Sequence, residues 1–124
     1  MFFSLLLFVT EVTFGQEKTI NIAKNAFQTA NVVSLSQYLH SEIAIVMEDE
    51  QASSGKSAAE NGLKTFFSKH VVTHFDFIHQ GSSKDGKVFA VGKYDYNGGC
   101  YRVRINLKNY DGEYLIDNID FTKE

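Results

Sequence analysis

The sequence has no proline and no tryptophan, and its 124 residues include a single cysteine, Cys100. Without proline, the tight turns have to be made by Gly, Asn and Asp. A single cysteine excludes an internal disulfide, so the apolar core must stabilise the fold. The chain also lacks a large excess of one charge, since 12 basic and 15 acidic side chains give a formal net charge of −3. This balance excludes the electrostatic footprint of a protein that binds nucleic acid or an anionic membrane surface.

The first fifteen residues, MFFSLLLFVTEVTFG, contain no Lys or Arg and carry an unbroken run of apolar or small residues at 2–9. This run is much shorter than the roughly 20 apolar residues of a membrane span. Together with the small residues Thr13 and Gly15, it indicates a secretory signal peptide at 1–15, although a buried N-terminal strand or helix is the alternative. We therefore expect one mature domain at 16–124, exported to the periplasm or the exterior, with no stable membrane span.

The second half of the chain contains three turn dipeptides, Asp85-Gly86, Asn97-Gly98 and Asp111-Gly112. Such dipeptides tolerate the positive φ angles of hairpin turns, and each lies between runs rich in Val, Ile, Phe and Tyr. Short turns join neighbouring strands antiparallel. The sequence therefore predicts a four-strand meander at about 71–80, 87–96, 100–108 and 113–121.

The first half has the spacing of helices. Apolar residues at helical intervals predict an amphipathic helix at about 18–31. Ser34 and Gln37 have the spacing of a capping box and suggest a second, short helix. Residues 42–48, EIAIVME, are apolar and β-branched enough for a strand.

After that strand, residues 51–57, QASSGKS, are interpreted as a polar loop. Ser57 and Glu60 form another capping box, and the apolar spacing behind it predicts a helix that ends near His70. Helices that pack on one antiparallel sheet define an α+β fold.

The predicted strands differ in their faces. Apolar and polar side chains alternate along the strand at 100–108, so we expect one face to be buried and the other to be exposed to solvent. The strand at 87–96 is apolar on both sides. We therefore expect it at the centre of the sheet, with helices on one face and a second subunit on the other. This pattern predicts a homodimer through the open sheet face.

The strand at 113–121 contains an anomaly, because Asp117 falls in the same alternating row as Leu115, Ile119 and Phe121. Burying an ionised carboxylate without partners is costly. Asp117 is therefore either a pocket acid or base, or a residue that a bulge brings to solvent. The pattern leaves both open, since a shift of one residue moves a side chain to the other face.

Residues 74–81, HFDFIHQG, place His79 in one row with Phe75 and Phe77. We expect this row to face the helices, where an imidazole could act as a general base. A hydrogen-bonded histidine in the core or at its rim is the alternative.

We expect no metal site and no cofactor. Alternation sends His74 and His79 to opposite faces, and His70 belongs to a helix end. The acidic run at 48–50 lacks the ligand pattern of a calcium loop and indicates a solvated strand end. Cys100 has cationic neighbours in its row but no nearby histidine base, so a passive thiol is expected.

Three segments carry a family resemblance, namely KSAAENGLKTFFSKH, FIHQGSSKDGKVFAVGKY and CYRVRINLKNYDGEYLIDNIDF. They resemble a family of uncharacterised exported bacterial proteins with the cone-shaped fold of nuclear transport factor two (NTF2-like), also called cystatin-like. The likeness extends from Gln16 to Glu124 and includes three shared features: Phe66-Phe67, Ile78-His79-x-Gly81 and Tyr101-Arg102-Val103. The resemblance implies N-terminal helices packed on a curved antiparallel sheet that ends in the meander.

The wider fold includes ketosteroid isomerase, polyketide cyclases and scytalone dehydratase, which use acids, histidines and tyrosines inside the cone. No active-site motif of these enzymes matches this sequence residue by residue, and fold alone does not decide function. Six residues are candidates for the pocket because of their strand face and position alone: Tyr38, Phe67, Phe77, His79, Tyr94 and Asp117.

Two functions follow from this interpretation. The first is a non-enzymatic exported module that binds a small apolar ligand or another protein. The alternative is a small acid-base enzyme of the isomerase, dehydratase or cyclase type, with Asp117 as base and His79 or a tyrosine as donor. The enzyme requires these side chains to converge on one cavity.

Overall fold

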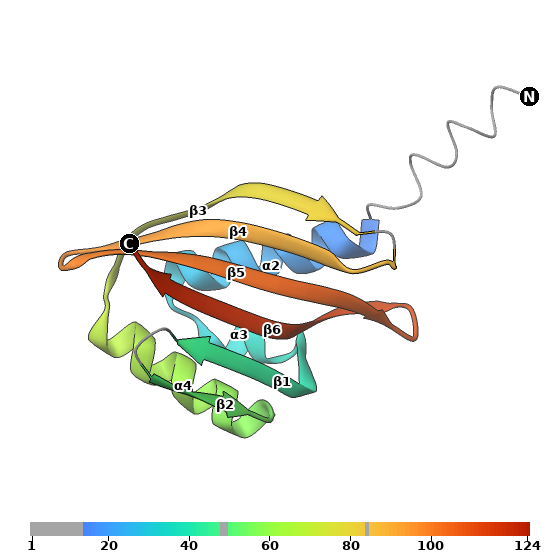
Figure 1. Ribbon diagram of the computed structural model, residues 1–124, viewed down its shortest axis with the longest axis horizontal. Coiled ribbons are helices and arrows are strands. Elements are labelled where there is room, and N and C mark those ends of the chain that lie inside the picture. The colour runs from blue at the N-terminus through green and yellow to red at the C-terminus, as the bar shows by residue number, and fades with distance from the viewer. Residues whose placement is uncertain (1–13, 48–49, 84) are drawn as a thin grey trace, which may run out of the picture.

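The computed structural model describes residues 14–47, 50–83 and 85–124 (Figure 1). The predicted signal peptide lies outside the described residues except for Phe14 and Gly15, which begin the first described helix. Most of the acidic run at 48–50 also lies outside them. None of the helices in the described part of the chain is long and apolar enough to cross a membrane.

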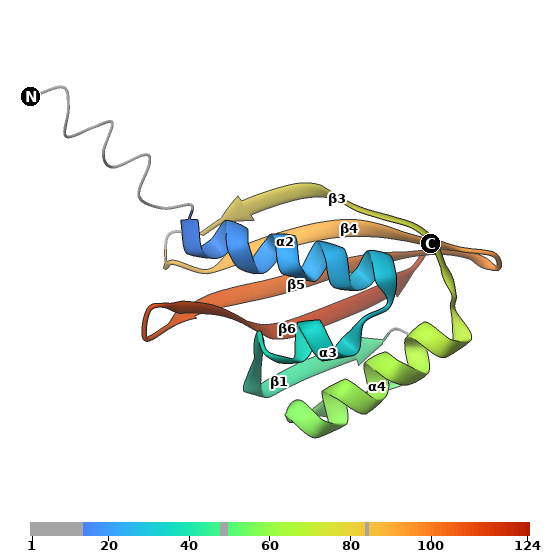
Figure 2. The same cartoon turned by 180° about the vertical axis from the view of Figure 1, so that it is seen from behind.

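The described residues form helices α2 (Phe14–Thr29), α3 (Val32–Ser36) and α4 (Lys56–Lys69) and strands β1 (Leu39–Met47), β2 (Glu50–Ser54), β3 (Val72–Ser82), β4 (Val88–Tyr96), β5 (Gly99–Tyr110) and β6 (Glu113–Lys123). The strands make one sheet in the order β2-β1-β6-β5-β4-β3. Helices α2 and α3 lie on one face of this sheet, and α4 lies beside β1 (Figure 2). The opposite face, turned to the viewer in Figure 1, has no helix over it among the described residues.

The predicted meander is confirmed, because β3, β4, β5 and β6 pair consecutively and antiparallel. The prediction of an antiparallel sheet is wrong at one place. Strand β1 pairs with β6 in parallel, so the sheet is mixed. Parallel neighbours need a long crossover, and here the whole of β2, α4 and β3 to β5 lies between β1 and β6 in the chain.

The segment interpreted as a polar loop at 51–57 instead contributes strand β2, which pairs antiparallel with β1. Its polar composition gave no strand signal. The backbone of β1 has N–H and C=O groups on the side away from β6, and these need partners whatever the side chains nearby are. Backbone pairing therefore made a strand that the side-chain pattern did not indicate.

The short helix and α4 are confirmed, but their N-termini differ from the predicted capping boxes. Asn31 caps α3, because its side chain accepts a hydrogen bond from the Ser34 backbone N–H at 3.1 Å. Gly55 caps α4 with a φ of 95°, which glycine adopts without strain. Glu60 accepts a hydrogen bond from Ser36 at 2.5 Å and so ties α4 to α3.

The hairpin turns follow the sequence in one case and differ in another. Asp111 and Gly112 both have positive φ, 55° and 92°, as expected for a two-residue turn. Neither Asn97 nor Gly98 has a positive φ. At Gly98 the glycine instead lets the backbone lie close to the Tyr96 ring, since a Cβ there would be 2.9 Å from that ring.

The space between the helices and the sheet is filled by aromatic rings. Phe27 on α2 stacks on Phe75 of β3 with ring centroids 5.0 Å apart, and it meets Phe67 of α4 edge-on at 5.7 Å. Tyr94 of β4 is fully buried, and Phe66 lies 5.1 Å from it. Each such ring contributes roughly 1.5 to 3 kcal/mol when it is fully buried. The cone is therefore a packed core.

Candidate functional site

Asp117 lies in a β-bulge. Leu107 pairs with Ile116 and Asn106 pairs with Asn118, so Asp117 has no partner across the ladder. The bulge changes the phase of the strand, and the core row of β6 consists of Ile116, Ile119 and Phe121. Leu115 pairs with Lys108 and lies on the other face, contrary to the predicted row. Of the two interpretations of Asp117, the structure supports the bulge.

The half-exposed carboxylate of Asp117 accepts a hydrogen bond from the Tyr110 hydroxyl at 3.0 Å. The Tyr110 ring stacks on His40 of β1 with centroids 4.0 Å apart. Partial burial and then the contact with Asp117 raise the pKa of the Tyr110 phenol. This group of polar side chains lies on the side of the sheet away from α2, so it does not line the interior.

His79 also lies away from the helices, and the expectation that it faces them is wrong. Phe77 pairs with Gly92 and His79 pairs with Val91, so Ile78 is a second bulge. After this bulge His79 shares a face with Phe89, and their ring centroids are 5.5 Å apart. The predicted row ended at Phe77 because the bulge reverses the alternation.

The structure does not bring Asp117 and His79 together. They lie on β6 and β3, with β5 and β4 between them. Three strand spacings of about 4.8 Å separate them by roughly 14 Å across the sheet alone. Asp117 and His79 therefore do not converge on one cavity.

Three of the other candidate pocket residues belong to the core. Phe67 and Tyr94 are buried, and Phe77 packs edge-on against Phe75 at 5.1 Å. The Tyr94 hydroxyl donates to the backbone carbonyl of His70 at 2.6 Å, and burial raises the pKa of this phenol above its usual range. These side chains fill the interior, and Phe67 also lines an open pocket with Ala30, Val32, Lys64 and Ser68 at the surface.

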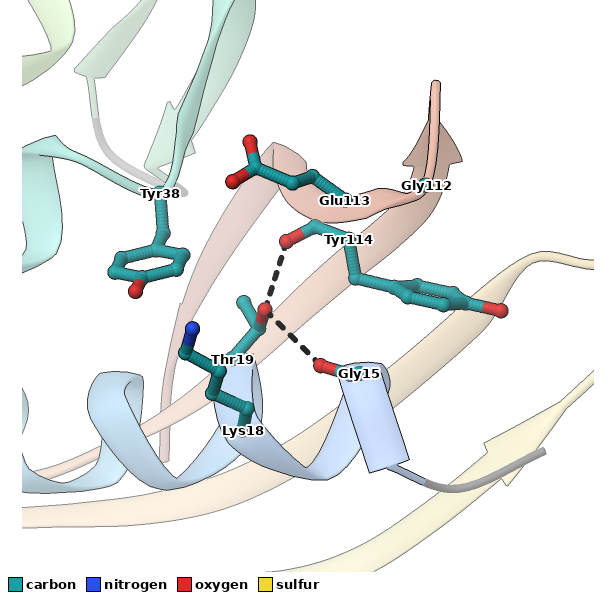
Figure 3. Close-up of a pocket in the computed structure, with 7 residues that line it drawn as sticks. All are labelled: Gly15, Lys18, Thr19, Tyr38, Gly112, Glu113 and Tyr114. Atoms are coloured by element: carbon teal, nitrogen blue, oxygen red, sulfur yellow. Dashed lines mark hydrogen bonds between the residues drawn. The ribbon is translucent and has the colours of Figure 1, made fainter. Parts of the chain in front are cut away.

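Tyr38 does line a pocket, at one end of the molecule (Figure 3). The pocket has a volume of about 130 Å³ and lies between the start of α2, the start of β1 and the β5–β6 turn. Its lining consists of Gly15, Lys18, Thr19, Tyr38, Gly112, Glu113 and Tyr114. Sequence reasoning found only Tyr38, because three segments far apart in the chain build this pocket.

The floor of this end pocket is held by Thr19, a buried polar side chain of α2. Its hydroxyl lies 2.7 Å from the Tyr114 carbonyl, to which it donates, and 3.4 Å from the Gly15 carbonyl (Figure 3). The backbone N–H of Ile116 donates to the Tyr38 carbonyl at 2.8 Å. These bonds join the three segments and fix the positions of the side chains around the pocket.

A second candidate surface is the outer face, the side of the sheet without helices. Its side chains include Val46 of β1, Phe89, Val91 and Lys93 of β4, Arg102, Arg104, Asn106 and Lys108 of β5, and Asn118, Asp120 and Thr122 of β6. Phe89 and Val91 are half-buried, and the Arg104 guanidinium lies 4.6 Å from the centroid of the Phe89 ring. This face joins apolar area to charged side chains of both signs.

Neither a metal site nor a reactive thiol emerges from the described residues. Among them, no three His, Cys, Asp or Glu side chains are placed to hold a metal ion. Partial burial, and then a hydrogen bond with Asp95, raise the pKa of the Cys100 thiol. A raised pKa reduces the thiolate fraction and so does not activate this cysteine.

The comparisons with known proteins agree on one family. The family described as Domain of unknown function (DUF4783) matches residues 20–122. The solved structure of a DUF4783 family protein from Bacteroides uniformis ATCC 8492 is 27% identical, with a TM-score of 0.77, over 84% of this chain and 95% of that one. A DUF4783 family protein from Bacteroides ovatus ATCC 8483 is 28% identical, with a TM-score of 0.76, over 83% of this chain and 93% of that one. No curated protein matches the sequence.

More distant structures show the fold alone. An NTF2-like protein of unknown function from Pseudomonas putida KT2440 is 10% identical, with a TM-score of 0.69, over 86% of this chain and 82% of that one. An uncharacterised protein with a cystatin-like fold from Caulobacter vibrioides is 12% identical, with a TM-score of 0.70, over 92% and 90%. The predicted α+β fold of the NTF2-like, cystatin-like type is confirmed.

Proposed function

This chain belongs to the DUF4783 family, a domain of unknown function, and from its own surfaces we propose a non-enzymatic module that associates with a second copy of itself through the outer face. We also propose that it acts outside the cytoplasm. The apolar run at residues 2–9, followed by small residues, supports export.

The observation that carries this proposal is the contrast between the two faces of the sheet. The inner face is closed by packed rings, with Phe75 and Tyr94 almost fully buried. On the outer face, Phe89 and Val91 stay half-buried and Val46 is 38% exposed. Phe89 and Val91 lie next to each other on this face of β4, and a contiguous exposed apolar patch is typical of a protein interface.

The charges of the outer face suit a second copy of the same surface. Arg102 and Arg104 lie along β5, and Asp120 lies beside them on β6, where it pairs across the ladder with Arg104. Among the described residues, no ion pair joins Arg104 to Asp120 within the chain. A two-fold axis parallel to the strands and above the β5–β6 boundary would place Arg104 of each copy opposite Asp120 of the other.

The size of the face is also suitable. The five neighbouring strands β1, β6, β5, β4 and β3 cover an area of roughly 20 Å by 30 Å. This estimate uses the usual spacing between strands and the usual rise per residue. The area is on the order of the 800 Å² that each partner buries in a standard interface. Two sheets that pack face to face interdigitate their side chains in the manner of a β-sandwich.

The β3 edge of the sheet is a less suitable surface for association. On edge strand β3, the carbonyl of Phe75 accepts a hydrogen bond from the Gln28 side chain at 3.0 Å. The Lys24 ammonium lies 3.4 Å from the carboxylate of Asp76 on the same strand. Helix α2 therefore blocks the middle of the β3 edge against another strand, which favours the outer face over this edge as the contact surface.

The test is the mass of the purified chain in solution, measured by analytical ultracentrifugation over a range of concentrations. We expect twice the 14.0 kDa of one chain at high concentration. Arg104→Asp and Asp120→Arg should each weaken association by at least about tenfold, because each places like charges opposite one another. The double variant should restore it, since the pairs are re-formed with reversed sign.

Lys64→Asp on α4 serves as the control charge reversal and should leave association unchanged, because Lys64 is exposed and lies away from the outer face. Thermal unfolding of every variant shows whether it is folded. A mass of one chain at all concentrations, or a double variant no better than the single ones, would contradict the proposal.

A further inference from the structure

The end pocket has no part in the proposed contact between outer faces. It lies at the end of the molecule where α2 begins and where the β5–β6 turn closes (Figure 3). Two of its side chains carry opposite charges, Lys18 from α2 and Glu113 from the first position of β6. The pocket therefore needs an explanation of its own.

The Lys18 ammonium and the Glu113 carboxylate both border the end pocket but do not form an ion pair with each other. In Figure 3 the Lys18 ammonium and the Glu113 carboxylate both point toward the side of the Tyr38 ring. The ion pairs of the described residues do not include one between Lys18 and Glu113. The partner of the Lys18 ammonium is the Tyr38 ring, 6.0 Å away from it. A ligand with groups of both signs could thus meet both side chains.

The two charged side chains enter the pocket from different elements. Lys18 comes from the first described turns of α2 and supplies the positive end of the pocket. Glu113 comes from the β5–β6 turn on the other side, so it supplies the negative end of the pocket.

The remaining walls limit the size of a ligand. A volume of about 130 Å³ is room for roughly four waters, at about 30 Å³ of liquid each. The ring of Tyr38 forms one wall, and the Thr19 hydroxyl of the floor is already bonded to the backbone. The pocket therefore suits a molecule of a few non-hydrogen atoms with charge at both ends.

We infer that the end pocket binds a small zwitterion, such as a free α-amino acid, with its carboxylate on Lys18 and its ammonium on Glu113. The Tyr38 ring covers the carbon between the two charged groups. No covalent step is involved. Specificity comes from the two charges together, because a molecule that carries only one of them leaves the other unpaired.

The experiment uses glycine as the probe and the ¹⁵N-labelled full chain. Amide resonances of Lys18, Thr19 and Glu113 are followed while glycine is added to about 20 mM, since so few ligand atoms provide only weak binding. We expect shifts that saturate. Acetate and methylammonium, each half of the zwitterion, should bind at least about tenfold more weakly.

Two variants and a control assign the contacts. Lys18→Gln and Glu113→Gln should each weaken glycine binding at least about tenfold, and both residues are exposed enough to be replaced without loss of the fold. Lys24→Gln is the control, because Lys24 lies on the same helix but pairs with Asp76 on β3. Arg104→Asp should bind glycine normally, which separates this site from the proposed dimer contact.

Three results would overturn the inference. Shifts that rise linearly with glycine show that the pocket does not bind it. Acetate that binds as well as glycine shows a simple anion site. Unchanged binding in either glutamine variant shows that the contacts are not those inferred here.

Discussion

The hydroxyl of Tyr110 donates a hydrogen bond to the carboxylate of Asp117 at 3.0 Å, across two neighbouring strands. This contact explains why an aspartate occurs among the apolar residues of β6. The bulge removes Asp117 from the core row, and the phenol satisfies one of its oxygens. Asp117 is therefore a structural partner of Tyr110 on the outer side of the sheet.

Replacing Asp117 by leucine should lower the stability of the protein. The variant loses the hydrogen bond and leaves the Tyr110 hydroxyl without its acceptor, at a cost of about 1 kcal/mol. Tyr110→Phe should cost a similar amount, and the double variant should cost less than the sum of the two. Urea unfolding measures all three. A clear rise in stability for Asp117→Leu would instead indicate a carboxylate buried without adequate partners.

Gly92→Ala should be strongly destabilising. A Cβ at this position would lie 2.6 Å from the buried ring of Phe75 and 2.9 Å from the backbone carbonyl of Asp76, so neither neighbour can yield cheaply. We expect a loss of at least about 2 kcal/mol.

Gly81→Ala is the matched comparison for Gly92→Ala. Its Cβ would meet only the ring of Phe89, at 2.7 Å, and this half-buried ring can turn outward. The loss should therefore be smaller than for Gly92. Thermal and urea unfolding of both variants measure the two losses of stability. Equal losses would show that the Phe89 ring is as rigid as the Phe75 ring.

Tyr94 should make the protein sensitive to alkali. Burial raises the pKa of Tyr94 in the folded protein, whereas the unfolded chain releases this proton near the ordinary tyrosine value of about 10. Above that pH the folded state binds more protons than the unfolded state, so the free energy of unfolding falls as pH rises. Below it, the contribution of Tyr94 is fully present.

Tyr94→Phe tests this sign. At neutral pH the variant should lose about 1 kcal/mol, since the hydroxyl no longer donates to the His70 carbonyl. Above pH 10 its stability should decline less steeply than that of the wild type. Tyr110→Phe should keep the steep decline, because the phenol of Tyr110 is only partly buried. Identical slopes in wild type and Tyr94→Phe would contradict the assignment.

The sequence by itself determined the local features of this protein. Turn dipeptides and alternation located the four strands of the meander, and helical spacing located α2 and α4, because these signals depend only on neighbouring residues. The apolar row of β5 was predicted and is buried, from Tyr101 to Leu107. The family resemblance extended this local information to the NTF2-like fold.

The candidate site was less predictable, because it depends on register. Alternation assumes an unbroken strand, and a bulge at Asp117 or at Ile78 reverses it without a local signal in the sequence. Both candidate catalytic side chains, Asp117 and His79, are affected by a bulge in this way. Of the six candidate pocket residues, Tyr38 lines the end pocket and Phe67 lines an open pocket beside α4.

The tertiary structure alone decided which surfaces are available for binding. The phase of β3 and β6 was set by their partner strands, and the parallel pairing of β1 with β6 was set by a crossover through most of the chain. The interior closed because rings from α2, α4, β3 and β4 fit together, and the end pocket formed where residues 15–19, Tyr38 and residues 112–114 meet. Such contacts join residues far apart in the sequence, and local patterns carry no information about them.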